Sequence, residues 1–168
     1  MGADGDDLHS VVVFRLGGEH FGVPVPVVRE VVPYAWLAQP PRMPNFVEGV
    51  LNLGGVAVPV MRLDDLLGMP RGKLGLDASI LIMKRPGAPM GLLVEHVDGV
   101  RPAAAFQMLP VEDRNSFQGC LVGELHGAGD DVHLISWEKV LMEEERRRLE
   151  QFQQSAQDRL AELADSET

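Results

Sequence analysis

Two diglycine turns, each set between short segments rich in β-branched residues, constrain the fold of this chain more than any other feature. Gly17-Gly18 predicts a β-hairpin over residues 11–25, and Gly54-Gly55 predicts a second one over residues 47–61. Glycine suits these positions because a two-residue hairpin turn needs positive φ angles at its central residues. Each returning segment also contains a proline, which is tolerated at a sheet edge or a bulge but not inside a central strand. A repeated hairpin of this kind favours an all-β barrel over alternating β and α units.

The remaining short apolar segments extend this mainly β pattern. Turn residues separate them at intervals of about 8 to 12 residues, which is typical of barrels and sandwiches. A short helix over residues 65–67, with Asp64 as its N-cap, is predicted to interrupt the strands. The further predicted strands cover residues 27–32, 80–83, 90–94, 97–100, 103–109, 120–125 and 132–135.

The pattern changes from strand to helix at Ser136, a favoured N-cap residue, and the helix is predicted to run to about residue 164. Its charged run over residues 143–148 is interpreted as a solvated face with ion pairs between residues four apart, Glu143 with Arg147 and Glu144 with Arg148. A narrow apolar stripe permits either docking on the barrels or pairing with another helix. The stripe consists of Leu149, Phe152, Ala156, Leu160 and Leu163.

Charge and cysteine content argue against several functional classes. The chain of 168 residues carries a formal net charge of −10, which disfavours binding to nucleic acid or to an anionic membrane. The single cysteine, Cys120, cannot form an intramolecular disulfide, and no apolar run reaches the length of a membrane-spanning helix. The first ten residues lack the basic and apolar regions of a signal peptide. We therefore expect a cytoplasmic protein that does not insert into the membrane.

No pattern in the sequence predicts a catalytic centre, a metal site or a cofactor. The five histidines are scattered without the spacing of metal ligands. Cys120 lies within an apolar strand pattern, where a buried and inert thiol is expected. Residues 68–74 are similar to a phosphate-binding loop, but they have three residues rather than four between the glycines and lack the hydroxyl that reaches Mg²⁺. We expect a protein without enzymatic activity.

The order of these motifs resembles the CheW domain family, and the resemblance covers roughly residues 10–142. Three stretches carry it. They are Phe14-x-Leu16-Gly17-Gly18-x-x-Phe21-Gly22-Val23-Pro24, then Met43-Pro44-x-Phe46-Val47-x-Gly49-Val50-Leu51-Asn52-Leu53-Gly54-Gly55, and the closing Leu134-Ile135-Ser136-Trp137.

The resemblance implies a pair of five-stranded β-barrels of the Src-homology-3 type that share a core, with a crossing region between Leu63 and Ser79. It divides the chain into an acidic, flexible N-terminus (residues 1–10), a double-barrel domain (residues 11–142) and a helical extension (residues 143–168). Such domains have no catalytic residues, and they stand alone in coupling proteins or are fused to receivers and kinases. We interpret this chain as a stand-alone adaptor that couples the helical tip of a methyl-accepting chemoreceptor to a CheA-type histidine kinase in a bacterial chemosensory pathway, beside membrane-associated receptor arrays.

The resemblance also supplies candidate residues for receptor and kinase binding. These are Val28, Glu30, Gly49, Asn52, Gly54 and Val56. Gly49 and Asn52 are equally compatible with a role in hairpin geometry, and the two valines with a place in the core. Gly54 departs from the family pattern, which usually has arginine there, so Glu30 lacks the guanidinium that could pair with it.

The helical extension supports an alternative hypothesis. In that interpretation the chain is a divergent assembly protein of the same family, and the stripe from Leu149 to Leu163 self-associates or binds a different partner.

Overall fold

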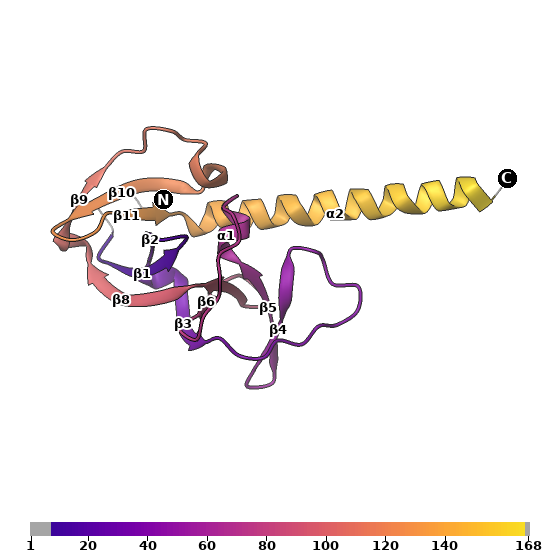
Figure 1. The fold of residues 1–168 in the computed structure, drawn as a ribbon, viewed down its shortest axis with the longest axis horizontal. Helices are drawn as coiled ribbons and strands as arrows, with labels where there is room; N and C mark the ends of the chain where they lie inside the picture. The colour runs from indigo at the N-terminus through magenta and orange to yellow at the C-terminus, as the bar shows by residue number, and fades with distance from the viewer. Residues whose placement is uncertain (1–7, 167–168) are drawn as a thin grey trace.

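The computed structural model describes residues 8–166, which form two adjoining β-barrels and one long helix that projects away from them (Figure 1). The first seven residues of the predicted N-terminal segment lie outside the described part. The strands are β1 (Ser10–Leu16), β2 (Glu19–Pro24), β3 (Val28–Pro33), β4 (Val47–Leu53), β5 (Val56–Arg62), β6 (Ser79–Met83), β7 (Met90–Val94), β8 (His96–Pro102), β9 (Phe106–Leu109), β10 (Leu121–Gly127) and β11 (Val132–Ile135). The helices are α1 (Leu63–Leu66) and α2 (Trp137–Ser166), with single 3₁₀ turns η2 (Val25–Val27), η3 (Ala103–Ala105) and η4 (Ser116–Gly119).

The strands form two sheets, which confirms the predicted mainly β fold class. The larger sheet has the order β8-β1-β2-β11-β10-β9, and the smaller has the order β3-β6-β7-β5-β4. The larger sheet contains six strands, one more than the five predicted. Its two outermost strands, β8 and β9, are joined only by the turn η3, so one stretch of chain crosses from one edge of this barrel to the other.

Both predicted hairpins are present, and their turns have the geometry that the glycine pairs indicate. The φ angles are +58° and +81° at Gly17 and Gly18, and +58° and +90° at Gly54 and Gly55. Two successive positive φ angles of this size are characteristic of a type I′ turn, whose twist matches that of the flanking strands. The turns therefore fix the registers Leu16 with Glu19 and Leu53 with Val56.

The smaller barrel is closed by the segment that follows β3. Ala38 and Val50 exchange two backbone hydrogen bonds, both of 2.9 Å, which attach this segment to β4 at the opposite edge of the sheet. Prolines on either side keep the segment out of a regular strand. The closing contact is consequently short, and the rest of the loop between β3 and β4 lies on the surface.

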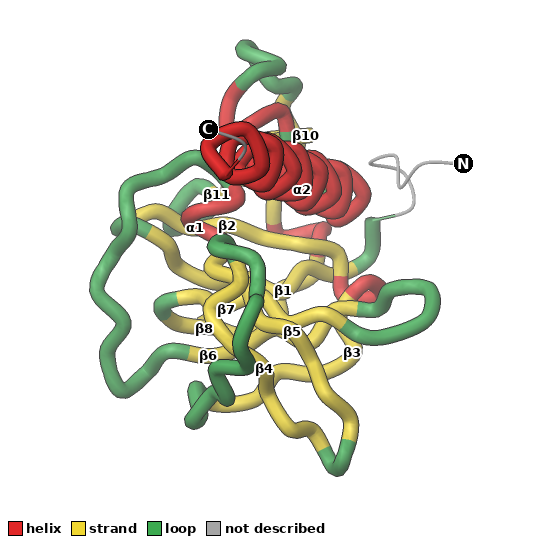
Figure 2. Tube along the Cα trace, turned by 90° about the vertical axis from the view of Figure 1, so that its right-hand side faces the viewer, coloured by secondary structure: helices red, strands yellow, loops and turns green. Residues whose placement is uncertain are grey.

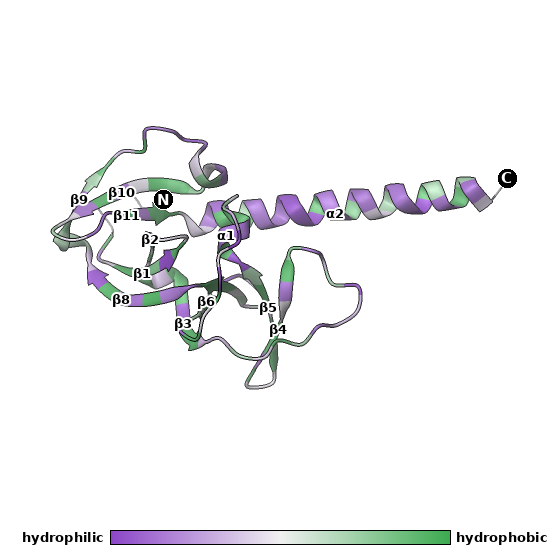
Figure 3. Cartoon of the chain, in the orientation of Figure 1, coloured by the Kyte–Doolittle hydropathy of each residue, from purple (hydrophilic) through white to green (hydrophobic). Residues whose placement is uncertain are grey.

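The two barrels share one apolar core, as the resemblance implies. Phe14 and Phe21 of the larger sheet belong to the same buried cluster as Met61, Leu81 and Leu92 of the smaller sheet. Apolar residues are present on strands of both sheets (Figure 3). This cluster joins the two barrels, and each barrel also has a smaller buried cluster of its own, around Ile80 in the smaller barrel and around Val13 in the larger one.

Helix α1 begins at Leu63, two residues before its predicted start. Its N-cap is Arg62, and no side chain caps it, so the expectation that Asp64 caps this helix is wrong. Asp64 is only 2% exposed and lies inside the protein. Its carboxylate binds the guanidinium of Arg62, at 2.8 and 3.0 Å, because that buried partner offers a better match than the backbone of a single helical turn.

Helix α2 begins where the sequence predicts. The Ser136 hydroxyl accepts a hydrogen bond from the Lys139 backbone N–H at 3.3 Å, as expected of an N-cap. Trp137 is buried, and its indole N–H donates to the Lys84 carbonyl at 2.7 Å. Figure 2, viewed along α2, shows the helix passing over α1 before it leaves the barrels.

Candidate interaction site

The β4–β5 hairpin presents three of the predicted binding residues at its tip. The Asn52 side-chain carbonyl accepts a hydrogen bond from the Gly55 N–H at 2.8 Å, which holds the turn in place. Asn52 and Gly54 are exposed, and Val56 is 46% exposed. A side chain at Gly54 would point into open space, with no atom within 4 Å of a Cβ. The tip is therefore ordered by its own turn and free to meet another molecule.

Strand β3, at the other edge of the same sheet, carries Val28 and Glu30. Val28 is half-buried and packs against the shared core, whereas Glu30 is exposed. Glu30 makes no hydrogen bond or ion pair with any residue between 8 and 166. The described contacts therefore assign no structural role to this carboxylate.

Gly49 lies apart from the other candidates because it is buried inside the barrel wall. A Cβ there would lie 2.5 Å from the Leu37 Cβ and 3.0 Å from the Ala38 carbonyl oxygen. Real Cβ atoms do not come that close, so this position requires glycine for the segment after β3 to close the barrel. The alternative of a purely structural role accounts fully for Gly49.

The sequence interpretation missed exposed apolar side chains between β3 and β4. Trp36 is 83% exposed and Tyr34 is 46% exposed, while Val31 within β3 is 41% exposed. Tryptophan and tyrosine are enriched among the residues that dominate binding energy in protein interfaces. The available signal was a tryptophan inside a proline-rich segment, where no amphipathic pattern would bury it.

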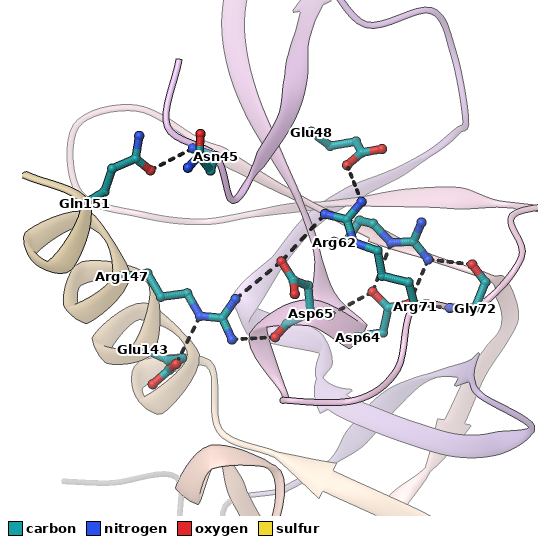
Figure 4. A network of polar contacts seen from close by, with 10 residues as sticks. All are labelled: Asn45, Glu48, Arg62, Asp64, Asp65, Arg71, Gly72, Glu143, Arg147 and Gln151. Atoms are coloured by element: carbon teal, nitrogen blue, oxygen red, sulfur yellow. Dashed lines mark hydrogen bonds and ion pairs between the residues drawn. The ribbon is translucent and has the colours of Figure 1, made fainter. Parts of the chain in front are cut away.

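A buried polar network connects the crossing region to β5 and was also missed (Figure 4). The Arg62 guanidinium donates to both carboxylate oxygens of Asp64 and to the Gly72 carbonyl, and the Gly72 N–H donates back to Asp64 at 3.0 Å. Burial of Asp64 opposes its ionisation, but the hydrogen bonds from Arg62 and Gly72 outweigh this and hold its pKa below the ordinary value. The network fixes the loop after α1 onto the barrel.

The base of α2 docks on the barrels first through Trp137 and Val140, which belong to the shared core, and then through charged and polar residues. Arg147 pairs with the Asp65 carboxylate of α1 at 3.3 Å and with Glu143 one turn earlier at 3.1 Å. One turn further on, the Gln151 side chain accepts a hydrogen bond from the Asn45 N–H at 2.7 Å. These contacts line one side of α2, facing α1 and the loop before β4 (Figure 4).

The interpretation of residues 143–148 as a solvated face is therefore wrong for two of its members. Glu143 is 7% exposed and Glu144 is 3% exposed. Both predicted ion pairs form, Glu143 with Arg147 and Glu144 with Arg148. Burial opposes ionisation of Glu143, but the guanidinium groups of Arg146 and Arg147 outweigh it and lower its pKa.

Cys120 is fully buried, which confirms the expectation of a structural thiol. Burial, and secondarily the charge of Glu143, raises its pKa to about 11, so almost none of it is thiolate at neutral pH. Between residues 8 and 166, no three side chains of metal-ligating type lie together. In the same range, no helix is long and apolar enough to cross a membrane.

Comparison with known proteins decides the family. The CheW-like domain profile matches residues 10–145, which include both barrels and the base of α2. The chain belongs to the CheW-like domain family. This confirms the resemblance drawn from the hairpin motifs. The match ends within α2, six residues before Gln151, which forms a hydrogen bond to Asn45.

The relatives agree with this assignment over most of the chain. The chemotaxis protein CheW of Rhizobium meliloti is 27% identical over 139 residues, which are 82% of this chain and 90% of that protein. Protein PilI of Pseudomonas aeruginosa is 32% identical over 107 residues, which are 61% of this chain and 60% of that protein. The crystal structure of scaffolding protein TtCheW from Thermoanaerobacter tengcongensis matches with a TM-score of 0.65 at 26% identity, over 77% of this chain and 85% of that one.

Family membership gives the CheW-like chain its general role. Proteins of this family are scaffolds rather than enzymes, which confirms the interpretation of a non-catalytic adaptor in chemotaxis signalling. The site of such a protein is a set of binding surfaces. Such surfaces consist of exposed side chains on a folded frame.

Proposed function

We propose that this CheW-like chain couples a chemoreceptor to a CheA-type histidine kinase, by binding the helical tip of the receptor and the kinase at the same time in the cytoplasm, beside membrane-associated receptor arrays. The observation that carries the proposal is Glu30, an exposed carboxylate without a partner among residues 8–166, on the same small barrel as exposed Trp36. The exposed hairpin tip at Asn52 and Val56 adds a second surface on this barrel.

Coupling of this kind needs no catalytic step in the adaptor. A scaffold that binds one arrangement of the kinase more tightly than another shifts the kinase towards that arrangement, by as much as its affinities for the two differ. The receptor changes the kinase activity when its signalling state alters the affinity of the scaffold for the kinase. The shared core and the Arg62–Asp64 network keep both surfaces in fixed positions relative to each other.

Reconstitution tests the coupling itself. Receptor cytoplasmic fragments, the cognate kinase and this chain are assembled on vesicles, and kinase autophosphorylation from labelled ATP is measured with and without the chain. We expect receptor-dependent autophosphorylation only when the chain is present. An identical rate in its absence would remove the proposal.

Matched substitutions test the surfaces. Glu30→Arg and Trp36→Ala should each weaken receptor or kinase binding by at least about tenfold, which is the effect of losing about 1.4 kcal/mol at an interface. The controls are Glu112→Arg, an exposed acid on a loop of the larger barrel, and Leu76→Ala, a fully exposed apolar residue. Equal binding by Glu30→Arg and Glu112→Arg would show that β3 is not the contact surface.

Gly54 allows a gain-of-function test. Arginine, the usual residue of the family at this position, meets no atom there and costs only the strain of a positive φ angle, about 1 to 2 kcal/mol. We expect Gly54→Arg to increase receptor or kinase affinity. Gly18→Arg, at the tip of the other hairpin and also without steric contacts, is the control and should leave affinity unchanged.

A further inference from the structure

The second half of α2 carries an apolar stripe that nothing in the described chain covers. Leu149, Phe152, Leu160 and Leu163 are 66%, 72%, 61% and 62% exposed. The hydrogen bond of Gln151 to Asn45 is the last that joins α2 to the barrels. Beyond it the helix projects alone, with apolar bands separated by polar ones (Figures 1 and 3).

The stripe faces away from the protein's own barrels. Successive residues of an α-helix are turned by about 100°, so a position on the helix surface follows from its number. Val140, Arg147 and Gln151, which contact the barrels, cluster on one side, and the stripe lies about 160° around the helix from them. Of the two options that the sequence left open, docking of the stripe on the barrels is therefore wrong.

The spacing of the stripe is symmetric about Ala156. Its five residues are separated by three, four, four and three positions, so the order of spacings is the same from either end. When two such helices run antiparallel with Ala156 at the crossing point, Leu149 meets Leu163 and Phe152 meets Leu160. Large side chains then oppose large ones, and the small alanine lets the helices approach at the centre.

We propose that α2 pairs with α2 of a second copy of this chain in an antiparallel arrangement whose two-fold axis passes beside Ala156. A surface related to itself by a two-fold axis must be self-complementary, and the spacing about Ala156 meets that condition. This inference is independent of the proposed coupling to a kinase, since it concerns the part of α2 that lies beyond the match to the CheW-like domain.

Charge favours this direction over a parallel pair. In a parallel pair in register, Glu145 would face Glu145 of the second copy, and Arg148 would lie beside Arg146. Antiparallel pairing separates these like charges and brings uncharged Gln153 and Gln157 together along one flank. It also places the two pairs of barrels at opposite ends of the helix pair, where they do not collide.

The contact has the size of a weak to moderate dimer interface. The overlap runs from Arg146 to Ser166, which is about 30 Å of helix at 1.5 Å per residue. With a contact about 10 Å wide on each helix, the pair buries on the order of 600 Å² in total at the contact stripe and roughly 1,000 Å² with the flanking side chains. We therefore expect a dimer that dissociates in the micromolar range.

Sedimentation equilibrium of the full chain, from about 1 to 200 µM, tests the dimer. We expect reversible dimerisation. Substitution of two residues that meet in the pair, Phe152→Glu with Leu160→Glu, should raise the dissociation constant at least about 100-fold, because it buries carboxylates in the contact. The control is Gln154→Glu with Ala161→Glu, which adds the same charge on another side of α2. A monomer throughout this range, or equal weakening by both double variants, would overturn the proposal.

Disulfide cross-linking tests the direction. When the separate variants Leu149→Cys and Leu163→Cys are mixed and oxidised, the antiparallel pair predicts a disulfide between the two variants. Each variant alone should form none, because identical residues lie 14 positions, about 21 Å, apart along the pair. Buried Cys120 does not compete. Efficient cross-linking of Leu149→Cys to itself would indicate a parallel pair and contradict the two-fold axis at Ala156.

Discussion

Gly49→Ala separates a structural role of this residue from a role in partner binding. The added methyl group would stand 2.5 Å from the Leu37 Cβ and 3.0 Å from the Ala38 carbonyl oxygen. One of these contacts is with backbone and the other with the first atom of a side chain, so neither can rotate away. The segment that closes the smaller barrel must therefore move outwards from β4.

The cost follows from what that segment contributes. The two hydrogen bonds between Ala38 and Val50 are each worth about 1 kcal/mol when they are lost or stretched. Leu37, now 6% exposed, would regain some 40 Å² of apolar surface, at about 25 cal/mol per Å². We expect Gly49→Ala to lower the free energy of unfolding by about 3 kcal/mol.

Urea unfolding followed by far-UV circular dichroism measures this difference. Gly75→Ala is the matched control, because no atom lies within 4 Å of its Cβ position and its φ angle is not positive; it should change stability by less than about 0.5 kcal/mol. At temperatures where Gly49→Ala remains folded, any loss of affinity for receptor and kinase should not exceed that of Trp36→Ala, because Gly49 acts only through the closing segment, which also carries Trp36. A variant as stable as the control, or one that is folded but binds more weakly than Trp36→Ala, would refute the packing argument.

Three further outcomes are expected. Asp64 and Glu143 have lowered pKa values in the folded state, so their ionised forms stabilise the fold above about pH 4. This contribution is lost as the pH falls through their folded pKa values, and the melting temperature should therefore drop steeply below about pH 4. Cys120, with its pKa raised to about 11, should react with a thiol reagent only at the rate of unfolding, and rapid labelling of the folded chain would contradict its burial. Arg147→Ala should increase amide exchange in the first turns of α2 while leaving β1 protected, because it removes the bond to Asp65. Unchanged exchange would mean that the other contacts of α2, such as those of Trp137 and Val140, are sufficient to anchor the helix.

The hairpins, the order of strands along the chain and the start of α2 could be predicted because each depends on local chemistry. Gly17-Gly18 and Gly54-Gly55 adopt positive φ angles that few other residues tolerate, and Ser136 caps α2 through a bond three residues away. Signals of this kind are complete within a few residues. The sequence therefore predicted the elements well, and the family resemblance supplied their arrangement into barrels.

The contacts that the sequence did not predict join residues whose partners are set by the fold. Asp64 was expected at a helix N-terminus, but Arg62 and the Gly72 backbone, brought together by the crossing loop, bury it in an ion pair. Glu143 has the spacing of a surface ion pair, but it is buried because the base of α2 packs against the barrels. A pattern that is amphipathic or charged locally does not reveal which long-range neighbour will cover it.

The candidate site shows the same division between local and long-range signals. A charge between valines in a strand has no packing role, which favours a surface position for Glu30, and Glu30 is exposed. Trp36 was overlooked because one aromatic residue in a proline-rich loop has no periodicity that predicts exposure or burial. Gly49 was grouped with the binding residues, although its glycine is explained by Leu37, twelve residues earlier in the sequence.

The two proposed surfaces lie on different parts of the molecule, and their separation has a mechanical consequence. Glu30 and the β4–β5 hairpin belong to the smaller barrel, whereas the stripe about Ala156 lies on the part of α2 that has left the barrels. In the antiparallel pair, the last hydrogen-bonded contacts of the two helices with their own barrels, at Gln151, would be about 15 Å apart along the axis. Each copy would then keep its coupling surfaces free. Two adaptors would be held at a fixed spacing. When one adaptor of the pair binds a receptor, the effective concentration of the second adaptor at the neighbouring receptor rises.

This predicts that Phe152→Glu with Leu160→Glu leaves kinase activation by an isolated receptor unchanged but lowers the adaptor's apparent affinity for clustered receptors. An equal loss in both assays would mean that the stripe contacts the receptor or the kinase directly.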